Sequence, residues 1–434
     1  MSVIAHSQII PGSAAAEGRD ATVFWNYIDF RFSPSCEIYI EIFLTRHDLV
    51  IKFLGNEPVA TVQPRINHPL TILTPKKSSR SHSVNNCFDC GTVACFRHSA
   101  KLSDAKGVSR TAFVLDEYWP EFNRYLTNAH KPKDIICVPL DGTRWNRSNY
   151  AWDLPGDSQV YTATWKTFIR AAQTRKLGKY GARRLQAQLE NAEAIASHFG
   201  RNLPPEVERV CVSQTLLPYL WSGGYLGGRI FDVLMTRVPL HTLHQILDSA
   251  AVKQPRHATL SEYRAPDWIV NAEKVALKAA EHIITPHSDI QKLFPDKTVA
   301  LSWHLPVAQS ITRGKSILFP GPTAARKGAY ELRDIAGELN LEILLPGSEL
   351  EGNEFWSGIR TKRIKRSEID GVGVVVQPAL LEDRPRTLLN AISCGLPVVA
   401  THACGLSSFP QVRHVEFGDK EGLRAAIIEI LSLS

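Results

Sequence analysis

The chain from Lys315 to its end alternates short apolar runs with stretches in which apolar residues recur every three or four positions. The runs predict strands, because a strand buried on both faces is continuously apolar, and the periodic stretches predict helices with one apolar face. The predicted strands are Ser316–Phe319, Leu341–Leu345, Val372–Val376 and Val398–Thr401, and the predicted helices are Tyr330–Leu339, Arg386–Cys394 and Leu423–Leu431. Strands that alternate with helices in this way predict a parallel sheet covered on both faces.

The earlier part of the chain has a weaker pattern. Its predicted strands are Val23–Ile28, Ile38–Leu44, Ile135–Leu140 and Val207–Ser213, followed by a helix over Asn271–His282 and a short strand that begins at Ile283. Pro, Ser and Gly interrupt the pattern between Leu305 and Lys315. Since 434 residues exceed one ordinary domain, we expect an α/β protein with two domains, residues 1–305 and residues 306–434.

The longest predicted helix, from Trp165 to Phe199, is strongly basic. Its apolar positions at helical spacing are Trp165, Phe168, Ile169 and Ala172. Its basic positions include Lys166, Arg170, Arg175, Lys176, Lys179, Arg183 and Arg184. We interpret the basic residues as a solvated charged face, and the alternative is a surface that rests on anionic lipid headgroups.

Composition and charge narrow the function classes only slightly. Hydrophobic residues make up 44% and charged residues 21%, which is ordinary for a globular protein. The formal net charge of +7 indicates an anionic partner, such as a nucleotide or a lipid phosphate, and no recognition motif favours nucleic acid. No apolar run is long enough to span a membrane and the N-terminus lacks a secretory signal, so we expect a cytoplasmic protein, with peripheral attachment to the inner face of the plasma membrane as a second expectation.

A basic loop over Gly321–Gly328 follows the first strand of the C-terminal pattern. In open α/β sheets, ligands bind beyond the carboxyl ends of the strands, and this loop joins a strand to a helix at such an end. The free N–H groups and the dipole of a helix N-terminus attract phosphate, and Arg326 and Lys327 strengthen that attraction. A solvated basic loop is the alternative, and it would be the better interpretation if this loop stood alone.

An acidic loop over Gln377–Pro385 occupies the corresponding position after a later strand. Pro385 suits the first position of the following helix, and Gly395 suits the position just past its end. Glu382 therefore precedes a helix N-terminus, where a carboxylate can accept sugar hydroxyls while amides hold phosphate. An acid that compensates the helix dipole is the equal alternative.

The segment Val372–Leu406 resembles the donor-site region of family 4 glycosyltransferases. That family carries two Glu residues separated by seven others, in a strand-loop-helix that ends Ala-x-x-Cys/Ala-Gly-x-Pro-Val-Val-Ala. Glu382 matches the first Glu, and Asn390 stands in the place of the second. The other matching positions are Ala391, Gly395, Pro397, Val398, Val399 and Ala400.

The basic loop is similar to the Gly-Arg-x-x-x-x-Lys-Gly phosphate loop of the same family. Gly321, Lys327 and Gly328 match it, whereas Pro322 replaces the Arg, for which Arg326 is a substitute. The resemblance covers roughly the last 120 residues well, with a weaker similarity over residues 271–306 and little before about residue 200.

The resemblance implies a GT-B enzyme, in which two Rossmann-like domains face each other across a cleft and the C-terminal domain binds the donor. It implies transfer of a sugar from a nucleotide sugar to a glycan, a lipid-linked or a small-molecule acceptor, with retention of configuration. Such enzymes use cationic side chains and a helix N-terminus to stabilise the departing diphosphate. We therefore expect no metal and no cofactor besides the nucleotide-sugar substrate.

Glu382 is the catalytic residue that the resemblance implies, facing the transferred sugar. The implied donor-binding residues are Arg326, Lys327, Gly328, Arg384 and Asn390. Lys327 and Arg326 would hold the diphosphate, and Asn390 would reach the ribose without charge assistance. The departures at Pro322 and Asn390 leave open a non-catalytic nucleotide- or glycan-binding protein with a GT-B shell, and a weaker alternative is an epimerase of the same shape.

Further features lie outside these two loops. The residue types of a zinc site occur at short spacing in Cys87, Cys90, Cys95 and His98, where a loop without metal is the expectation. The other cysteines are scattered and expected to be reduced, mostly buried thiols. The glycine-rich turn Trp221–Arg229 is interpreted as a loop at the interdomain cleft, with a simple turn as the alternative. We expect His287 and His304, near the domain junction, to be packed or helix-capping residues and not catalytic ones.

Overall fold

The computed structural model describes residues 2–6, 25–33, 36–44, 49–54, 110–177, 181–204, 206–262, 264–365 and 368–432. Its contacts divide the chain into two compact units, Met1–His82 and Ser83–Ser434. The strands of the first unit pair antiparallel in the order β1 (Ser2–His6), β2 (Trp25–Ser33), β3 (Cys36–Leu44) and β4 (Leu49–Leu54). The predicted domain of residues 1–305 thus includes this sheet and the larger one described next, and its extent as one domain stays a prediction.

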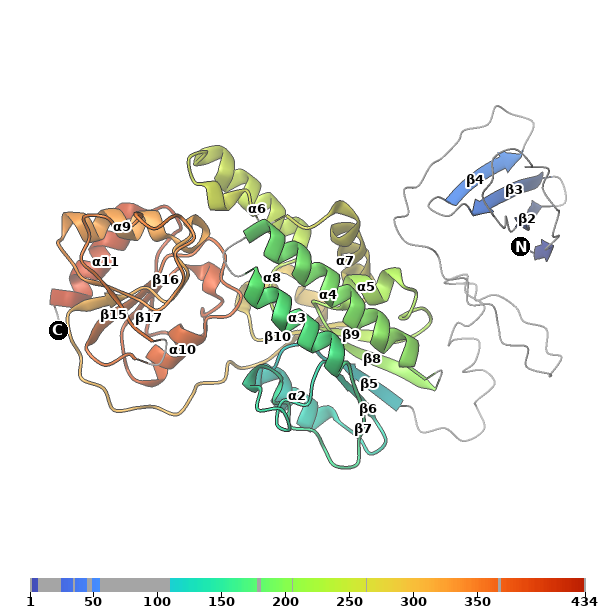
Figure 1. Ribbon diagram of the computed structural model, residues 1–434, viewed down its shortest axis with the longest axis horizontal. Coiled ribbons are helices and arrows are strands. Elements are labelled where there is room, and N and C mark those ends of the chain that lie inside the picture. Colours follow the sequence, from blue (N-terminus) through green and yellow to red (C-terminus); the bar gives the residue numbers. More distant parts are fainter. Residues whose placement is uncertain are drawn as a thin grey trace. The chain divides into compact units, whose positions relative to one another are not determined.

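The second unit begins with a seven-stranded parallel sheet (Figure 1). Its strands lie in the order β11 (Thr298–Ala300), β10 (His282–Thr285), β9 (Ile230–Leu234), β8 (Val207–Ser213), β5 (Arg110–Val114), β6 (Ile135–Val138) and β7 (Gln159–Thr162). Its helices are α2 (Pro120–Ala129), α3 (Thr164–Lys176), α4 (Gly181–Asn202), α5 (Leu217–Ser222), α6 (Leu240–Lys253), α7 (Asp267–Ala279) and α8 (Ser288–Leu293). Short 3₁₀ turns are η1 (Ser148–Tyr150), η2 (Ala258–Leu260) and η3 (Pro295–Lys297).

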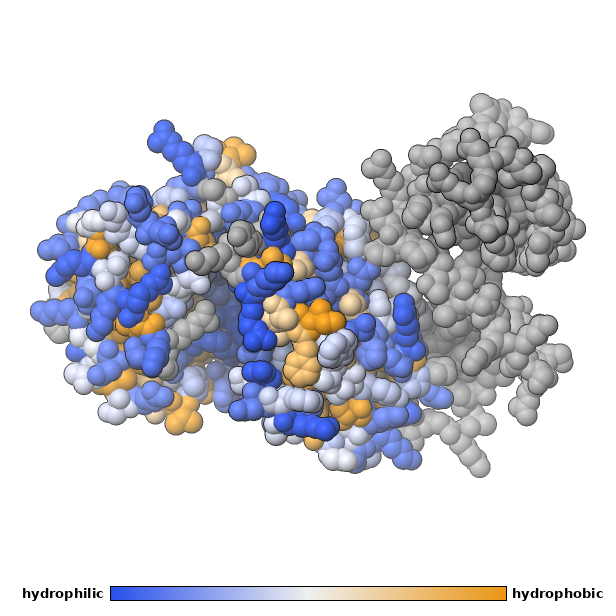
Figure 2. Space-filling model, in the orientation of Figure 1, coloured by the Kyte–Doolittle hydropathy of each residue, from blue (hydrophilic) through white to orange (hydrophobic). Residues whose placement is uncertain are grey.

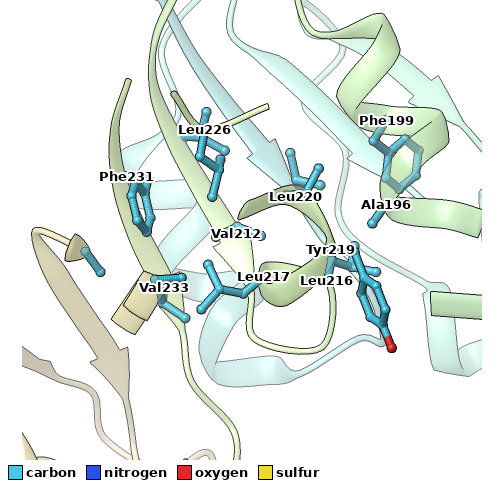
Figure 3. Packing of buried hydrophobic residues seen from close by; sticks show 14 of the residues in the cluster. Ala196, Phe199, Val212, Leu216, Leu217, Tyr219, Leu220, Leu226, Phe231 and Val233 are labelled. Atoms are coloured by element: carbon cyan, nitrogen blue, oxygen red, sulfur yellow. The ribbon is translucent and has the colours of Figure 1, made fainter. Parts of the chain in front are cut away.

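An apolar core fills the space between this sheet and the helices on one of its faces (Figure 3). Phe199 comes from α4, Leu217 and Leu220 from α5, Val212 from β8 and Phe231 from β9, and all five are buried. Burying each such side chain contributes about 1.5–3 kcal/mol relative to leaving it in water. The core therefore fixes the strands of this sheet, and with them the loops at their carboxyl ends.

The chain continues into a six-stranded parallel sheet (Figure 1). Its strands lie in the order β14 (Thr361–Arg363), β13 (Ile343–Leu345), β12 (Ser316–Leu318), β15 (Val372–Gln377), β16 (Val398–Ala400) and β17 (Val412–His414). Its helices are α9 (Ala329–Glu338), α10 (Arg386–Ser393) and α11 (Lys420–Ser432), with 3₁₀ turns η4 (Ala325–Lys327) and η5 (His402–Cys404). The protein is thus α/β with two Rossmann-like sheets, which confirms the predicted GT-B class.

One predicted helix is wrong. The single helix predicted from Trp165 to Phe199 is two helices, since α3 ends at Lys176 and α4 begins at Gly181. Glycine costs about 1 kcal/mol relative to alanine inside a helix, and the sequence places Gly178 and Gly181 at this division. Among the described helices, none combines the length and the apolarity needed to cross a bilayer.

A buried ion pair joins α2 to α10, and so joins the two parallel sheets. Arg386, the first residue of α10, donates two hydrogen bonds to the Glu121 carboxylate, at 2.8 and 2.6 Å. Its guanidinium also lies 4.8 Å from the ring centre of Trp119 and 5.7 Å from that of Trp303. Burial raises the pKa of Glu121, but Arg386 and main-chain hydrogen bonds together outweigh burial and hold that pKa below its ordinary value. The main-chain N–H of His304 donates to the same carboxylate at 2.8 Å.

Replacing Glu121 by Ala would leave Arg386 without its carboxylate, so we expect the free energy of unfolding to fall by about 3–5 kcal/mol. The pair between Glu117 and Arg384 is half-exposed, and Glu117→Ala should cost at most about 1 kcal/mol. Because folding lowers the pKa of Glu121, its contribution is present above its ordinary pKa of 4.5 and is lost as the pH falls below it. Urea unfolding at neutral and acidic pH measures both effects, and equal costs for the two variants would contradict this account.

Candidate functional site

The strand order of the six-stranded sheet reverses between the neighbouring strands β12 and β15. From β12 the chain proceeds to β13 and β14 on one side, and from β15 it proceeds to β16 and β17 on the other. Loops that leave such a switch point diverge at the carboxyl edge and open a crevice, which is where ligands bind in sheets of this kind. The loop after β12 contains η4, and the loop after β15 leads into α10, so both sequence-predicted loops stand at this edge.

Lys327 of the first loop and Glu382 of the second form an ion pair. Lys327 Nζ lies 2.9 Å from Glu382 Oε2 and also donates to the carbonyl oxygen of Leu381, at 2.7 Å. Main-chain bonds reinforce the contact, because the carbonyl oxygen of Arg326 accepts from the N–H of Leu380 at 2.9 Å. The structure therefore brings together the residues that the sequence assigned to the diphosphate and to the sugar.

Gly328 allows the two loops to approach this closely. Its φ of +77° lies in the left-handed region, where a side chain is strained. A Cβ atom at this position would lie 2.2 Å from the carbonyl oxygen of Pro378, in the second loop. Both the backbone conformation and the missing side chain are required, so the glycine at position 328 has a physical reason.

The Glu382 carboxylate is held in its charged form. Burial raises its pKa, but the ammonium of Lys327, the main-chain N–H of Arg384 and the charge of Arg326 together outweigh burial and lower the pKa. The N–H of Arg384 lies 3.0 Å from Glu382 Oε1. With its pKa below the ordinary value of 4.5, the carboxylate is an acceptor of hydrogen bonds at neutral pH.

Arg384 is oriented toward the other parallel sheet. Its guanidinium donates to the Glu117 carboxylate at 2.8 Å and to the carbonyl oxygen of Tyr118 at 2.9 Å, and it lies 5.2 Å from the ring centre of Trp119. The predicted donor contact of this guanidinium would require it to leave these partners. In the structure Arg384 serves the site through its main-chain N–H on Glu382.

Asn390 lies in the middle of α10 and is half-buried. Its main-chain carbonyl oxygen accepts from Ser393 Oγ at 2.8 Å, while its side-chain amide makes no hydrogen bond to another described residue. Gly395, predicted just past the helix end, has a φ of +74°, and its N–H donates to the carbonyl oxygen of Ile392 at 3.1 Å. Asn390 therefore stands on a well-terminated helix whose N-terminus begins beside Glu382.

Sequence reasoning missed a second carboxylate at this edge. Glu351, in the loop after β13, accepts at Oε1 from the N–H of Ala325 at 2.7 Å, and the Thr259 hydroxyl donates to the same oxygen. The hydroxyl of Tyr330 donates to Glu351 Oε2 at 3.0 Å. The first amide of η4 is thus occupied, although the sequence predicted free N–H groups there. The loop with Glu351 also follows the carboxyl end of a strand, so the rule that places ligands at such ends applies to it equally. The hydrogen-bond partners of Glu351, however, come from distant parts of the chain.

A further acid, Glu262, lies near Arg326 and Glu351 in the loop after η2. Burial, and then the negative charge of Glu351, raise its pKa, while Arg326 lowers it. The surroundings of η4 thus include two carboxylates besides Glu382. The pKa of Glu262 is raised, whereas the pKa of Glu382 is lowered.

His287 is packed, as the sequence predicted. Its ring is buried, its Nε2 lies 3.2 Å from the carbonyl oxygen of Glu382, and a Cβ on Gly405 would lie 2.6 Å from the ring. The thiols of Cys137 and Cys404 are also buried as expected, and burial raises the pKa of each to about 12.

The interpretation of the glycine-rich turn as a cleft loop is wrong. The turn leads into the amino end of β9, and Arg229 anchors it to the carbonyl oxygens of Val207 and Pro204, at 3.0 Å each, at the start of β8. Amino ends of parallel strands lie at the edge opposite the one where their carboxyl ends meet. The candidate zinc ligands Cys87, Cys90, Cys95 and His98 lie outside the described residues.

No protein-family model matches the chain. Part of the chain is similar to a D-inositol 3-phosphate glycosyltransferase from Pseudarthrobacter chlorophenolicus, with 27% identity over 238 residues. The similarity covers 44% of this chain and 54% of the relative, so the chain spans about half the length of the relative that it matches.

Solved structures with a similar arrangement include LpCGTa in complex with UDP, at 12% identity and a TM-score of 0.38, covering 75% of this chain and 91% of that one. Another is UGT89C1 from Arabidopsis thaliana complexed with UDP-L-rhamnose, at 11% identity and a TM-score of 0.40, covering 76% and 93%. At scores of this size the fold assignment rests on the strand order of the two sheets and not on these structures.

Gly328→Ala and Gly395→Ala form a matched pair, because both glycines have left-handed backbones but only Gly328 lacks room for a Cβ. We expect Gly395→Ala to lower the free energy of unfolding by about 1–2 kcal/mol. Gly328→Ala should cost clearly more, because the loop must also move away from Pro378. Denaturant unfolding of both variants measures the difference, and similar costs would show that the approach of the two loops is looser than described.

Proposed function

We propose that the protein transfers a sugar from a nucleotide-sugar donor to an acceptor. One observation carries the proposal: at the switch point of the six-stranded sheet, the buried ammonium of Lys327 is bonded to the Glu382 carboxylate at 2.9 Å. A diphosphate requires positive charge, and the sugar attached to it requires hydrogen-bond acceptors beside that charge. The partial similarity to D-inositol 3-phosphate glycosyltransferase supports the same assignment.

In this proposal the diphosphate binds at η4. Lys327 has three N–H donors, of which two reach Leu381 and Glu382, and we assign the third to a phosphate oxygen. Arg326 supplies a second cation beside the same turn. These charges stabilise the nucleoside diphosphate as the bond to the sugar breaks, so the reaction needs no metal and no resident cofactor.

Glu382 accepts hydrogen bonds from hydroxyls of the transferred sugar, and its lowered pKa keeps it able to do so. Asn390 reaches the ribose from α10. Arg384 positions Glu382 through its main-chain N–H and connects the site to Glu117 of the other sheet. Transfer with retention of configuration, as the family resemblance implies, is part of this proposal.

The acceptor is proposed to be a glycan, a lipid-linked glycan or a small molecule that enters from the seven-stranded sheet, in the cytoplasm or at the inner face of the plasma membrane. A second candidate function is a nucleotide- or glycan-binding protein without catalysis. The contact of Glu351 with the Ala325 amide favours the glycan-binding form of this candidate, because it removes one phosphate donor from η4.

Thermal unfolding in the presence of UDP, GDP, ADP and their sugars tests the donor site. A nucleotide that binds the folded protein at about 100 times its dissociation constant stabilises it by about 2.7 kcal/mol and raises the melting temperature. Arg326→Gln should weaken that nucleotide by about tenfold or more, since a hydrogen bond to a charged group contributes about 1.5–3 kcal/mol. Arg424→Gln, on α11, is the charge-matched control and should bind as the parent does. Equal weakening in both variants, or no shift with any nucleotide, would contradict the proposal.

Glu382→Gln separates the enzyme from the binding protein. We expect this variant to keep nucleotide affinity but to lose about 100-fold or more in transfer rate, as removal of one electrostatic group from an active site does. Release of nucleoside diphosphate with and without a panel of acceptors is the measurement, at a temperature where the variant is folded. A parent protein that binds nucleotide and transfers no sugar would establish the second candidate instead.

A further inference from the structure

The apolar stripe of α3 faces solvent. Trp165 is 76% exposed and Ile169 is 40% exposed. The opposite side of the helix, which packs on the protein, is polar: the hydroxyl of Thr167 is buried and donates to the carbonyl oxygen of Pro139 at 2.7 Å. A helix normally turns its apolar stripe to the core, so an apolar stripe in water indicates an interaction surface.

The loop before η1 extends this stripe. Trp145 is 44% exposed, and its ring packs edge-on against Phe168 with ring centroids 5.2 Å apart. We name Trp145, Trp165, Phe168 and Ile169 the α3 face. Figure 2 shows apolar side chains gathered over the region where Figure 1 draws α3, with hydrophilic residues on either side.

Basic residues accompany the α3 face. The loop before η1, α3 itself and the start of α4 all contain basic residues. They are Arg144 and Arg147 in the loop, Lys166, Arg175 and Lys176 on α3, and Arg183 and Arg184 on α4. α3 contains no acidic residue. In the loop before η1, Asp141 accepts from the main-chain N–H of Arg144 at 2.9 Å. Basic residues therefore outnumber acidic residues on α3 and in this loop.

We propose that the α3 face docks on the surface of an anionic lipid bilayer. Tryptophan is favoured at the boundary between acyl chains and headgroups, and aliphatic side chains beside it enter the acyl region. Each nearby Lys or Arg strengthens attachment to an anionic surface, by about fivefold in the partition coefficient. A second copy of the chain fits this face poorly, because the same cations would meet across the interface.

The inner side of α3 connects this face to the candidate site. Arg170 donates to the Asp116 carboxylate at 2.7 Å and to the hydroxyl of Tyr150 at 2.6 Å. Asp116 is the second residue after β5 and precedes Glu117, which pairs with Arg384. Docking would thus place the membrane on the acceptor side. A lipid-linked acceptor in that membrane would lie next to the donor, and this consequence rests on the proposed function. Docking of the α3 face on the bilayer does not depend on the proposed function.

Sedimentation of the full chain with lipid vesicles tests the docking. We expect the protein to bind vesicles of phosphatidylcholine mixed with phosphatidylglycerol much more tightly than vesicles of phosphatidylcholine alone, and less tightly as salt is raised. Trp165→Ala should lower the partition coefficient by about tenfold, and Lys166→Gln by about fivefold.

Matched controls lie on other helices. Val252, on α6, is 82% exposed, and Lys274, on α7, is exposed, so Val252→Ala and Lys274→Gln should bind vesicles as the parent does. Melting temperatures should be unchanged in all four variants, because the replaced side chains make few contacts. Absence of binding to anionic vesicles, or equal losses in test and control variants, would overturn the proposal.

Self-association is measured on the same samples by sedimentation velocity. Concentration-dependent dimers that Trp165→Ala abolishes would assign the α3 face to a second copy and would also overturn the proposal. The nucleotide-dependent rise in melting temperature is a separate measurement, so a failure of docking and a failure of the donor site are distinguishable.

Discussion

The ion pair between Lys327 and Glu382 is the contact on which the candidate site depends. Burying two charges costs several kcal/mol each, and their attraction offsets that cost only when hydrogen bonds satisfy the remaining atoms. Here the carbonyl oxygen of Leu381 accepts from Lys327, and the N–H of Arg384 donates to Glu382. The pair joins two turns that follow neighbouring strands, and Gly328 permits their approach. Paired charges of both signs at the carboxyl edge of the sheet are the result.

The turn that carries Glu382 also holds the two parallel sheets together. Arg384 donates to Glu117, and Arg386 donates to the buried Glu121. Residues 382–386 therefore belong both to the candidate site and to the contact between the two sheets. Glu351 makes a second connection, because it accepts from Thr259 of one sheet's loops and from Ala325 of the other's. The geometry around the site is therefore coupled to the relative placement of the two sheets within this unit.

The parts of this architecture that depend on local sequence were predictable. Apolar runs and helical spacing predicted the three helices and four of the six strands of the six-stranded sheet, but not the short strands β14 and β17. Gly395 marked the end of α10 because only a left-handed residue suits that position. The contacts of Arg384 with Glu117 and of Thr259 with Glu351 were not predictable, since the paired residues lie 267 and 92 positions apart in the chain. The apolar stripe of α3 predicted a helix but not its orientation, which depends on the tertiary bond between Thr167 and Pro139.

A double-mutant cycle on Lys327 and Glu382 tests the central claim most directly. The free energy of unfolding is measured for the parent, Lys327→Met, Glu382→Gln and the double variant. Each single change leaves a buried charge without its partner, whereas the double change removes both charges. The account predicts that the double variant loses less stability than the sum of the single losses, by about 1.5–3 kcal/mol. Losses that add to within about 0.5 kcal/mol would show that the two side chains do not depend on each other, and would contradict the account.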